Sequence, residues 1–369
     1  MRILRHRRRG ASITEYGLLI GLIGIVALLS IETTGQSIRG LFAGLGNQVN
    51  SVVNVAGGED GTAGAGGGQQ AVDNQGPFDG RILVHTKEIN AHRLDRLNED
   101  TLAQVTGGSW PFVAGDGSTY LTSVAADGAG NVYVGNGGGD ALYKLNDQGV
   151  QQWQIDYTGG VKAVEIGPSG NVYTAVADKT LRKIAPDGTE IWSQAIPGNP
   201  EALAVDGDGN AYVGDRSDVV TQFEDQGASA TQGWQYAGQG QSVIALAVDA
   251  SGNVFSGDGS GAIHKIDAAG NGSGFFTIGD GVNALDVDGT GAVYAGSDNT
   301  RVHKIRPDGS TNEWRYFDPN NSVEDVVVAA DGFVYAVDSD GGVHKIDDAG
   351  NQVTSVNLGN NHRAIAIAP

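Results

Sequence analysis

The chain has 369 residues, including 59 glycines and no cysteine, and its formal net charge at pH 7 is -20. This length allows two or more domains, and the lack of cysteine excludes a fold that is held together by disulfides. The negative charge disfavours binding to nucleic acid and to anionic membrane surfaces, and it favours the solubility of a displayed domain. Composition therefore disfavours two classes of partner without identifying a ligand.

The N-terminus combines a basic segment with an apolar one. Residues 1–9 contain five arginines and no acid, and residues 16–31 are apolar apart from Ser30 and the glycines. Counted from Ile13, the apolar stretch has 19 residues, which as a helix covers ~28 Å of a bilayer. The arginines favour a cytoplasmic N-terminus, so the rest of the chain is expected outside. No A-x-A cleavage site follows, and the simplest interpretation is an uncleaved signal anchor.

Glu15 lies at the start of this apolar stretch and does not fit a simple anchor. An ionised carboxylate in hydrocarbon is costly and usually marks a paired, functional group. The alternative is a capping box at the helix start, formed by Ser12 and Glu15. The string GASITEYG, residues 10–17, has basic residues before it and apolar residues after it. In this setting it resembles the processing site of Flp-type (type IVb, tight-adherence) prepilins.

The resemblance implies a processed subunit. A prepilin peptidase would remove the leader, residues 1–10, after Gly10 and leave Ala11 as the new N-terminus. Glu15 and Tyr16 would then be the fifth and sixth mature residues, the Glu-Tyr pair of that family. The Ala11 ammonium would pair with Glu15 of a neighbouring subunit, and breaking such a buried pair typically costs ~3–5 kcal/mol. Ala11, Glu15 and Tyr16 are therefore expected to direct assembly into a helical homopolymer.

A second helical pattern follows the apolar stretch. From Ile38 to Val53, apolar residues recur at helical spacing and form one stripe. We expect a pilin helix over residues 11–55 that forms the filament core; a helix on the membrane surface, or one packed on the later domain, is the alternative. Residues 56–76 contain eight glycines and one bulky apolar residue. This composition predicts a flexible Gly-rich linker.

From residue 77 onward the sequence repeats. A strand of the form G-x-V-Y, or a close variant, begins at 80, 130, 170, 209, 252, 291 and 332, and the steps after the first are 40, 39, 43, 39 and 41 residues. A period near 40 with four short strands per unit is typical of a β-propeller. We therefore predict an all-β seven-bladed β-propeller, preceded by the long N-terminal pilin α-helix and the linker.

The ends of the repeat indicate how the ring closes. The first strand of the repeat also occurs seven times, but its last copy, AIAI at 364–367, has no second strand after it. The second strand at 81–84 has no first strand before it. Pairing these two strands would complete the N-terminal blade and remove exposed edges. The predicted domains are the leader 1–10, the helix 11–55, the linker 56–76 and the propeller 77–369, closed by the strand 363–367.

Four tryptophans recur within the repeat. Trp153, Trp192, Trp234 and Trp314 follow the blade glycine by 22 to 25 residues. With runs such as GNVYVGNGGGDALYKLNDQGVQQW (130–153), the repeat resembles the quinoprotein-like (PQQ-like) and NHL-type propeller families. The resemblance implies that these tryptophans dock between blades. It implies architecture only, because the function of a propeller lies in its loops.

Four histidines also recur. His92, His264, His303 and His344 each lie 12 residues after the blade glycine. Equivalent positions in different blades should be too far apart for bonds of ~2.0–2.1 Å to one zinc ion. We therefore expect these histidines to pack between blades and to bind no metal.

Two further features have a structural and a functional interpretation. The segments 205–210, 248–253 and 287–292 resemble calcium loops but lack the full oxygen spacing and the terminal glutamate. They predict type I turns instead. The insertion at 95–120 contains Trp110 and Phe112, and we favour a packed loop over a ligand-contact loop. No nucleophile elbow, P-loop or CxxC motif occurs, so no catalytic or cofactor-binding residue is expected.

These features favour a structural subunit of a type IVb (Flp/Tad-like) pilus that is not an enzyme and has no cofactor. The precursor would lie in the inner membrane, and the mature chain in an extracellular pilus on the cell surface. Its partners would be its own copies, prepilin peptidase, the pilus assembly machinery and an unknown extracellular ligand that the propeller binds in adhesion, with no nucleic acid. Two alternatives stay open: a membrane-anchored extracytoplasmic propeller that acts as a binding scaffold, and an exported quinoprotein- or lactonase-type enzyme.

Overall fold

The computed structural model describes residues 82–88, 91–114, 120–238, 240–317, 321–359 and 364–368. Within these ranges the chain forms 28 β-strands and no helix. No membrane-spanning helix is found in the same ranges. The predicted leader, pilin helix and linker lie outside the described residues, so the structure bears on the propeller alone.

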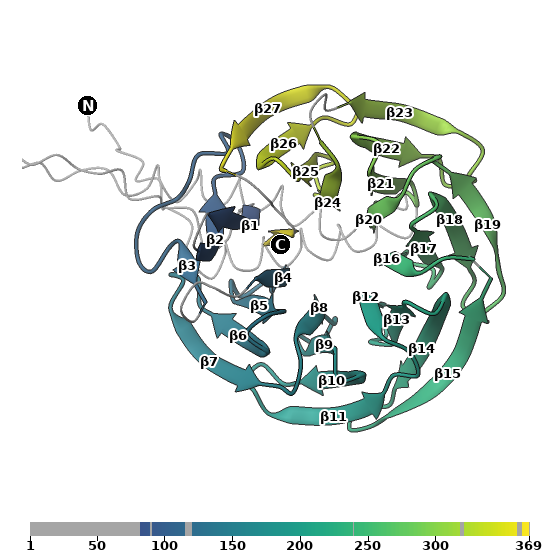
Figure 1. Cartoon of the computed structure of the whole chain (residues 1–369), viewed down its shortest axis with the longest axis horizontal. Coiled ribbons are helices and arrows are strands. Elements are labelled where there is room, and N and C mark those ends of the chain that lie inside the picture. The colour runs from purple at the N-terminus through teal and green to yellow at the C-terminus, as the bar shows by residue number, and fades with distance from the viewer. Residues whose placement is uncertain are drawn as a thin grey trace, which may run out of the picture. The chain divides into compact units, whose positions relative to one another are not determined.

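The strands form seven antiparallel sheets of four strands, arranged as blades around a common centre (Figure 1). This arrangement confirms the predicted all-β seven-bladed propeller. The first blade contains β28 (Ile365–Ile367), β1 (Ile82–Glu88), β2 (Ala91–Leu97) and β3 (Phe112–Val113). The second contains β4 (Leu121–Ala126), β5 (Val132–Asn136), β6 (Ala141–Leu145) and β7 (Gln151–Asp156). The third contains β8 (Val161–Ile166), β9 (Val172–Val176), β10 (Thr180–Ile184) and β11 (Glu190–Ala195).

The remaining four blades follow in chain order. The fourth contains β12 (Pro200–Val205), β13 (Ala211–Asp215), β14 (Val219–Asp225) and β15 (Ala230–Ala237). The fifth contains β16 (Val243–Val248), β17 (Val254–Asp258), β18 (Ala262–Ile266) and β19 (Gly272–Thr277). The sixth contains β20 (Val282–Val287), β21 (Val293–Ser297), β22 (Arg301–Ile305) and β23 (Asn312–Phe317). The seventh contains β24 (Val323–Val328), β25 (Val334–Asp338), β26 (Gly342–Ile346) and β27 (Gln352–Asn357).

The burial of a strand depends on whether neighbouring blades cover both of its faces. The second strand of a blade is covered on both faces by neighbouring blades, and every residue of β9 is buried. The V-Y core of the repeat suits this position, because β-branched and aromatic side chains fit a strand covered on both faces. The outermost strand β7 alternates between exposed and half-buried residues, since one of its faces meets solvent.

The ring closes in the first blade, where the C-terminal strand β28 pairs with β1. The register is antiparallel, with Ile365 opposite Val84 and Ile367 opposite Ile82. The amide of His85 also donates to the carbonyl of Ala364 at 3.0 Å. This is the pairing that the repeat predicts, and it joins the two ends of the described chain in one sheet.

Tryptophans of the outermost strands dock on the next blade, as the spacing predicts. The indole N–H of Trp153 donates to the carbonyl of Pro186 at 3.1 Å, and that of Trp314 donates to Asp348 at 2.8 Å. Trp234 donates to Ala268 at 3.2 Å, and Trp192 donates to the carboxylate of Asp225 at 2.9 Å. Each acceptor lies in or beside the turn between the third and fourth strands of the following blade, so these side chains tie adjacent blades together.

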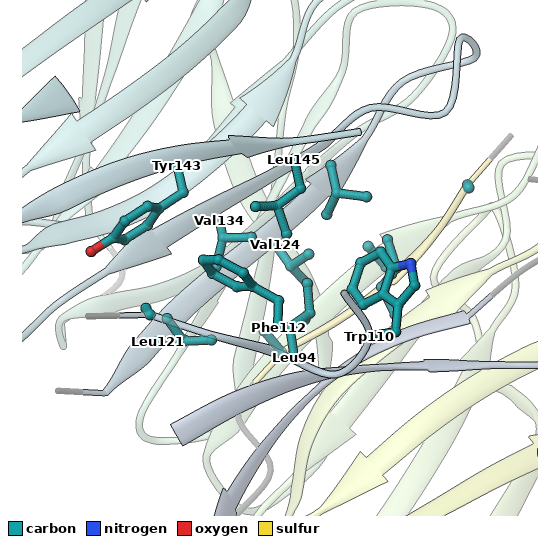
Figure 2. Close-up of a cluster of buried hydrophobic side chains, with 14 of the residues drawn as sticks. Leu94, Trp110, Phe112, Leu121, Val124, Val134, Tyr143 and Leu145 are labelled. Carbon is teal, nitrogen blue, oxygen red and sulfur yellow. The ribbon is translucent and has the colours of Figure 1, made fainter. Parts of the chain in front are cut away.

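The insertion in the first blade supplies a fifth docking tryptophan. Trp110 is buried and donates to the carbonyl of Asp147 in the second blade at 3.0 Å. Phe112 lies beside it and meets the ring of Tyr143 edge-on, with centroids 5.6 Å apart (Figure 2). The expected packed loop is thus observed for Trp110 and Phe112, whereas residues 115–119 lie outside the described part of the chain.

Candidate functional site

A cavity of about 420 Å³ lies at the centre of the ring, which we call the central channel. It is lined by the innermost strand of every blade: β4, β8, β12, β16, β20, β24 and β28. Most of the lining side chains are alanine, valine, leucine or isoleucine. Three acids interrupt this apolar wall, and we call Glu165, Asp286 and Asp325 the channel carboxyls.

The channel carboxyls occupy positions where other blades have small residues. The innermost strands of the fourth and fifth blades contain the same sequence, ALAV, at 202–205 and 245–248. Glu165 and Asp286 take the place of its second alanine, and Asp325 takes the place of its first. Because alternate residues of a strand share a face, the three acids lie on equivalent faces of their strands.

Two channel carboxyls bridge neighbouring blades. Asp286 accepts the amide of Val328 in the seventh blade at 2.7 Å, and Asp325 accepts the amide of Ile365 in the closing strand at 2.9 Å. The second oxygen of each carboxyl accepts the amide of the residue that follows in its own strand. These bonds therefore cross the junction between the sixth and seventh blades and the junction where the ring closes.

Glu165 has a different environment. Among the described residues, no hydrogen-bond donor contacts its carboxyl. Its side chain is half-buried because it borders the channel, around which the innermost strands of the seven blades are arranged. Burial raises the pKa of Glu165 to about 8, and the carboxylates of Asp286 and Asp325 add to the increase.

The pKa values of the two aspartates are raised less. Burial raises the pKa of Asp325 to about 7, although the amides of Ile365 and Val326 oppose the increase. Burial likewise raises the pKa of Asp286 to about 6 against the amides of Val328 and Val287. Hydrogen bonds from amides stabilise the ionised form, which explains why these groups are more acidic than Glu165. With pKa values raised to about 6, 7 and 8, the channel carboxyls bind protons near neutral pH.

The channel does not fit an anionic quinone cofactor. Its described lining contains carboxyl groups and no basic side chain that would neutralise such a molecule. Across the part of the chain that the structure describes, no three or more histidine, aspartate or glutamate side chains are placed so that they could hold one metal ion, and this includes the channel carboxyls. What the arrangement does provide is a set of proton-binding groups in a confined space.

The four recurring histidines lie in different blades, and each has its own hydrogen-bond partner. His264 shares a hydrogen bond with the hydroxyl of Tyr236 at 2.8 Å, and His344 shares one with Tyr316 at 3.1 Å. Both tyrosines belong to the preceding blade, so the prediction of packing between blades is confirmed for these two histidines. His92 shares a hydrogen bond with His85, and its ring lies 6.4 Å from that of Tyr120, which directly precedes β4 of the second blade, so it also packs between blades. His303 shares a hydrogen bond with Asn299 of its own blade, and packing between blades stays a prediction for it.

The calcium-like segments form turns. In 205–210, the carbonyl of Asp206 accepts the amide of Gly209 at 3.1 Å. One carboxylate oxygen of Asp206 accepts the amides of Asp208 and Asn210, and the other accepts the hydroxyl of Tyr212 at 2.8 Å. The segments 248–253 and 287–292 repeat the same amide bonds through Asp249 and Asp288. The predicted turns are confirmed, and the carboxylates of these aspartates accept backbone amides of their own turns.

The predicted processing and assembly residues, Gly10, Ala11, Glu15 and Tyr16, lie outside the described residues. The structure therefore brings together none of the site residues that the N-terminal motif predicts. It does bring together the channel carboxyls, which sequence reasoning missed. Their signal was visible in the repeat as an acid in a column of small residues, in AVEI, ALDV and DVVV.

Comparison with known families gives a match that covers most of the ring. The model of the family described as outer membrane protein assembly factor BamB matches residues 92–353, which is more than half of the 369-residue chain. The match begins in β2 and ends in β27, so it covers almost the whole ring. A comparison with curated proteins found no match. The matched range does not include residues 10–17, so it does not test the prepilin interpretation, which stays a prediction from the sequence.

Proposed function

This chain belongs to the family described as outer membrane protein assembly factor BamB, and from that premise we propose that its propeller is an extracytoplasmic scaffold that binds other proteins. The observation that carries the proposal is the closed ring of seven sheets. A closed ring holds its turns in fixed positions around two faces, which is what a binding platform requires.

The N-terminal sequence supplies the attachment of this scaffold to a membrane. Five arginines in residues 1–9 precede the apolar stretch that runs from Ile13 to Ile31. We propose that this segment inserts into the inner membrane with the arginines on the cytoplasmic side, so that the propeller lies outside the cytoplasm.

The partners proposed for this scaffold are proteins of the cell envelope. The family description names a role in outer membrane protein assembly, and we extend that class of partner to this chain. Exposed apolar side chains are available on different parts of the ring. Ile244 on the innermost strand β16, Val353 on the outermost strand β27 and Val150 beside a turn are 38%, 51% and 43% exposed.

Photo-crosslinking in cells that produce the full-length chain tests this proposal. A photoreactive amino acid replaces Ile244, Val353 or Val150 in separate variants, and samples kept dark are the control. A scaffold with a defined binding face gives discrete crosslinks to envelope proteins from some of these positions and not from others. No crosslink at any position, or equal labelling of many unrelated proteins at all three, contradicts the proposal.

A second candidate function is favoured by the sequence GASITEYG. We propose as the alternative that the chain is a subunit of a type IVb pilus, with residues 11–55 in the filament core and the propeller displayed for adhesion. In this role the Ala11 ammonium would pair with Glu15 of a neighbouring copy, so that each buried charge has a partner.

N-terminal sequencing of the mature protein separates the two candidates. A chain that begins at Ala11 supports the pilus subunit, whereas a chain that keeps residues 1–10 supports the anchored scaffold. Glu15→Ala is expected to permit cleavage and to abolish filament formation, while Glu32→Ala, at the far end of the apolar stretch, is the matched control. Normal filaments from the Glu15→Ala variant rule out the proposed pairing.

A further inference from the structure

The channel carboxyls face one another across the ring. The innermost strands contact each other in the order β4, β8, β12, β16, β20, β24, β28 and back to β4. Two strands therefore separate β8 from β20 on one side, and two separate it from β24 on the other (Figure 1). Glu165 on β8 consequently lies opposite Asp286 and Asp325, and all three border one cavity.

No basic side chain in the described lining offsets their charge. The lining contributions of β4, β12, β16 and β28 contain no charged side chain. The charged neighbours that act on the cluster from β24 and from the turn after β20 are also acids, since Glu324 acts on Asp325 and Asp288 acts on Asp286. Like charges in a confined space disfavour full ionisation, independently of how strongly each group is buried.

The same carboxyls hold the inner edges of two junctions between blades. Asp286 binds the amide of Val328 across the junction between the sixth and seventh blades. Asp325 binds the amide of Ile365 in β28, which has three residues where the other innermost strands have six. A change of charge in the channel therefore acts directly on the shortest of these strands, the one that closes the ring.

We propose that Glu165, Asp286 and Asp325 form a pH-sensitive lock on the ring, which is firm while the cluster holds protons and loosens when all three carboxyls ionise. Protonation removes the repulsion between Glu165 and the two aspartates. When the proton lies on the oxygen that faces the aspartate's own strand, the other oxygen still accepts the amide of the next blade. Full ionisation places three negative charges around the cavity, and the ring relieves this repulsion by separating at the junctions that Asp286 and Asp325 bridge.

The sign of the pH dependence follows from linkage. All three groups bind protons more tightly in the folded ring than in an unfolded chain. Stability from the cluster is therefore greatest below the ordinary pKa of a carboxyl and is lost as the pH rises to about 8, the folded pKa of Glu165. Between pH 5 and pH 9 we expect the melting temperature to fall by roughly 5 °C from this cluster.

Thermal melting of the full-length chain from pH 5 to pH 9 tests the proposal with Glu165→Gln. This substitution keeps the shape of the side chain and removes no hydrogen bond among the described residues. We expect it to flatten the pH dependence of the melting temperature and to stabilise the ring at pH 9. Asp208→Asn, which removes one exposed charge from a turn, is the matched control and is expected to leave the pH dependence unchanged.

Two measurements locate the effect. Infrared spectroscopy at pH 7 is expected to show a protonated carboxyl band that is weaker in Glu165→Gln and unchanged in Asp208→Asn, because Asp325 contributes the remainder of the band. Amide exchange is expected to show roughly tenfold less protection of Ile365 at pH 9 than at pH 5, and no such loss for Val213 in the fourth blade. The proposal is overturned if Glu165→Gln and Asp208→Asn have the same pH dependence, or if the carboxyl band is absent from the unsubstituted protein.

Discussion

Gly296 lies on β21 where the next blade leaves no room for a side chain. A Cβ atom at this position would be 2.8 Å from Cγ1 of Val323, which is the first residue of β24. The other near atoms are Cβ and the carbonyl oxygen of Val323, both at 3.4 Å. Gly296→Ala therefore creates a conflict with one side chain across the junction between the sixth and seventh blades.

The size of the effect follows from this geometry. Carbon atoms in contact are normally ~3.5–4.0 Å apart, so the two blades must separate by about 1 Å at this point. Overpacking of a buried site costs about 1–3 kcal/mol, and in a domain of this size 2 kcal/mol lowers the melting temperature by roughly 5 °C. Val323→Ala alone removes two buried methyl groups, and we expect it to cost about 2 kcal/mol.

The two substitutions together test the mechanism. With Val323→Ala in place, the nearest atoms to a Cβ at 296 are 3.4 Å away, which is an ordinary contact. The double variant is thus expected to be more stable than the sum of the two losses predicts, by about 1 kcal/mol or more. Chemical denaturation of all three variants measures this difference. Gly289→Ala, at a site with no atom within 4 Å of the added carbon, is the control and should stay within about 0.5 kcal/mol of the unsubstituted protein. Strict additivity, or a Gly296→Ala variant as stable as Gly289→Ala, refutes the proposed contact.

Three further predictions concern junctions and turns. Asp225→Ala leaves the ammonium group of Lys183, which is 4% exposed, without its partner, and should cost about 3–5 kcal/mol in chemical denaturation. Asp206→Ala removes the acceptor of two turn amides and a buried tyrosine hydroxyl, and should cost about 2 kcal/mol, whereas Asp208→Ala next to it should be nearly neutral. Equal losses from these two variants contradict the assigned role of the turn acid. Deletion of residues 363–369 removes the innermost strand of the first blade and should abolish the single cooperative thermal transition; an unchanged melt argues against closure by β28.

The sequence by itself determined the architecture of the ring. The spacing of the G-x-V-Y strands gave the number of blades, and the unpaired strands at the two ends predicted the pairing of β28 with β1. The turns at 205–210 and its equivalents were also predictable. These features are local or periodic, because each blade is built from consecutive strands and each turn acid binds amides two and four residues further along.

The tertiary structure alone decided where function can reside in the propeller. Glu165 and Asp325 are far apart in the chain, and they border one cavity only because the ring closes and brings their strands around the same channel. The repeat marked them as exceptions in a column of small residues, but it did not show that this column faces the channel. The docking role of Trp110 was also not predictable from the repeat, because the insertion places it farther from the blade glycine than the other tryptophans. Its indole N–H nevertheless donates to the carbonyl of Asp147 in the next blade, as those of the other docking tryptophans do in theirs. Residues from distant blades come close only when their strands lie at the centre of a closed ring. A pattern within one repeat does not show which face of its strand points to that centre.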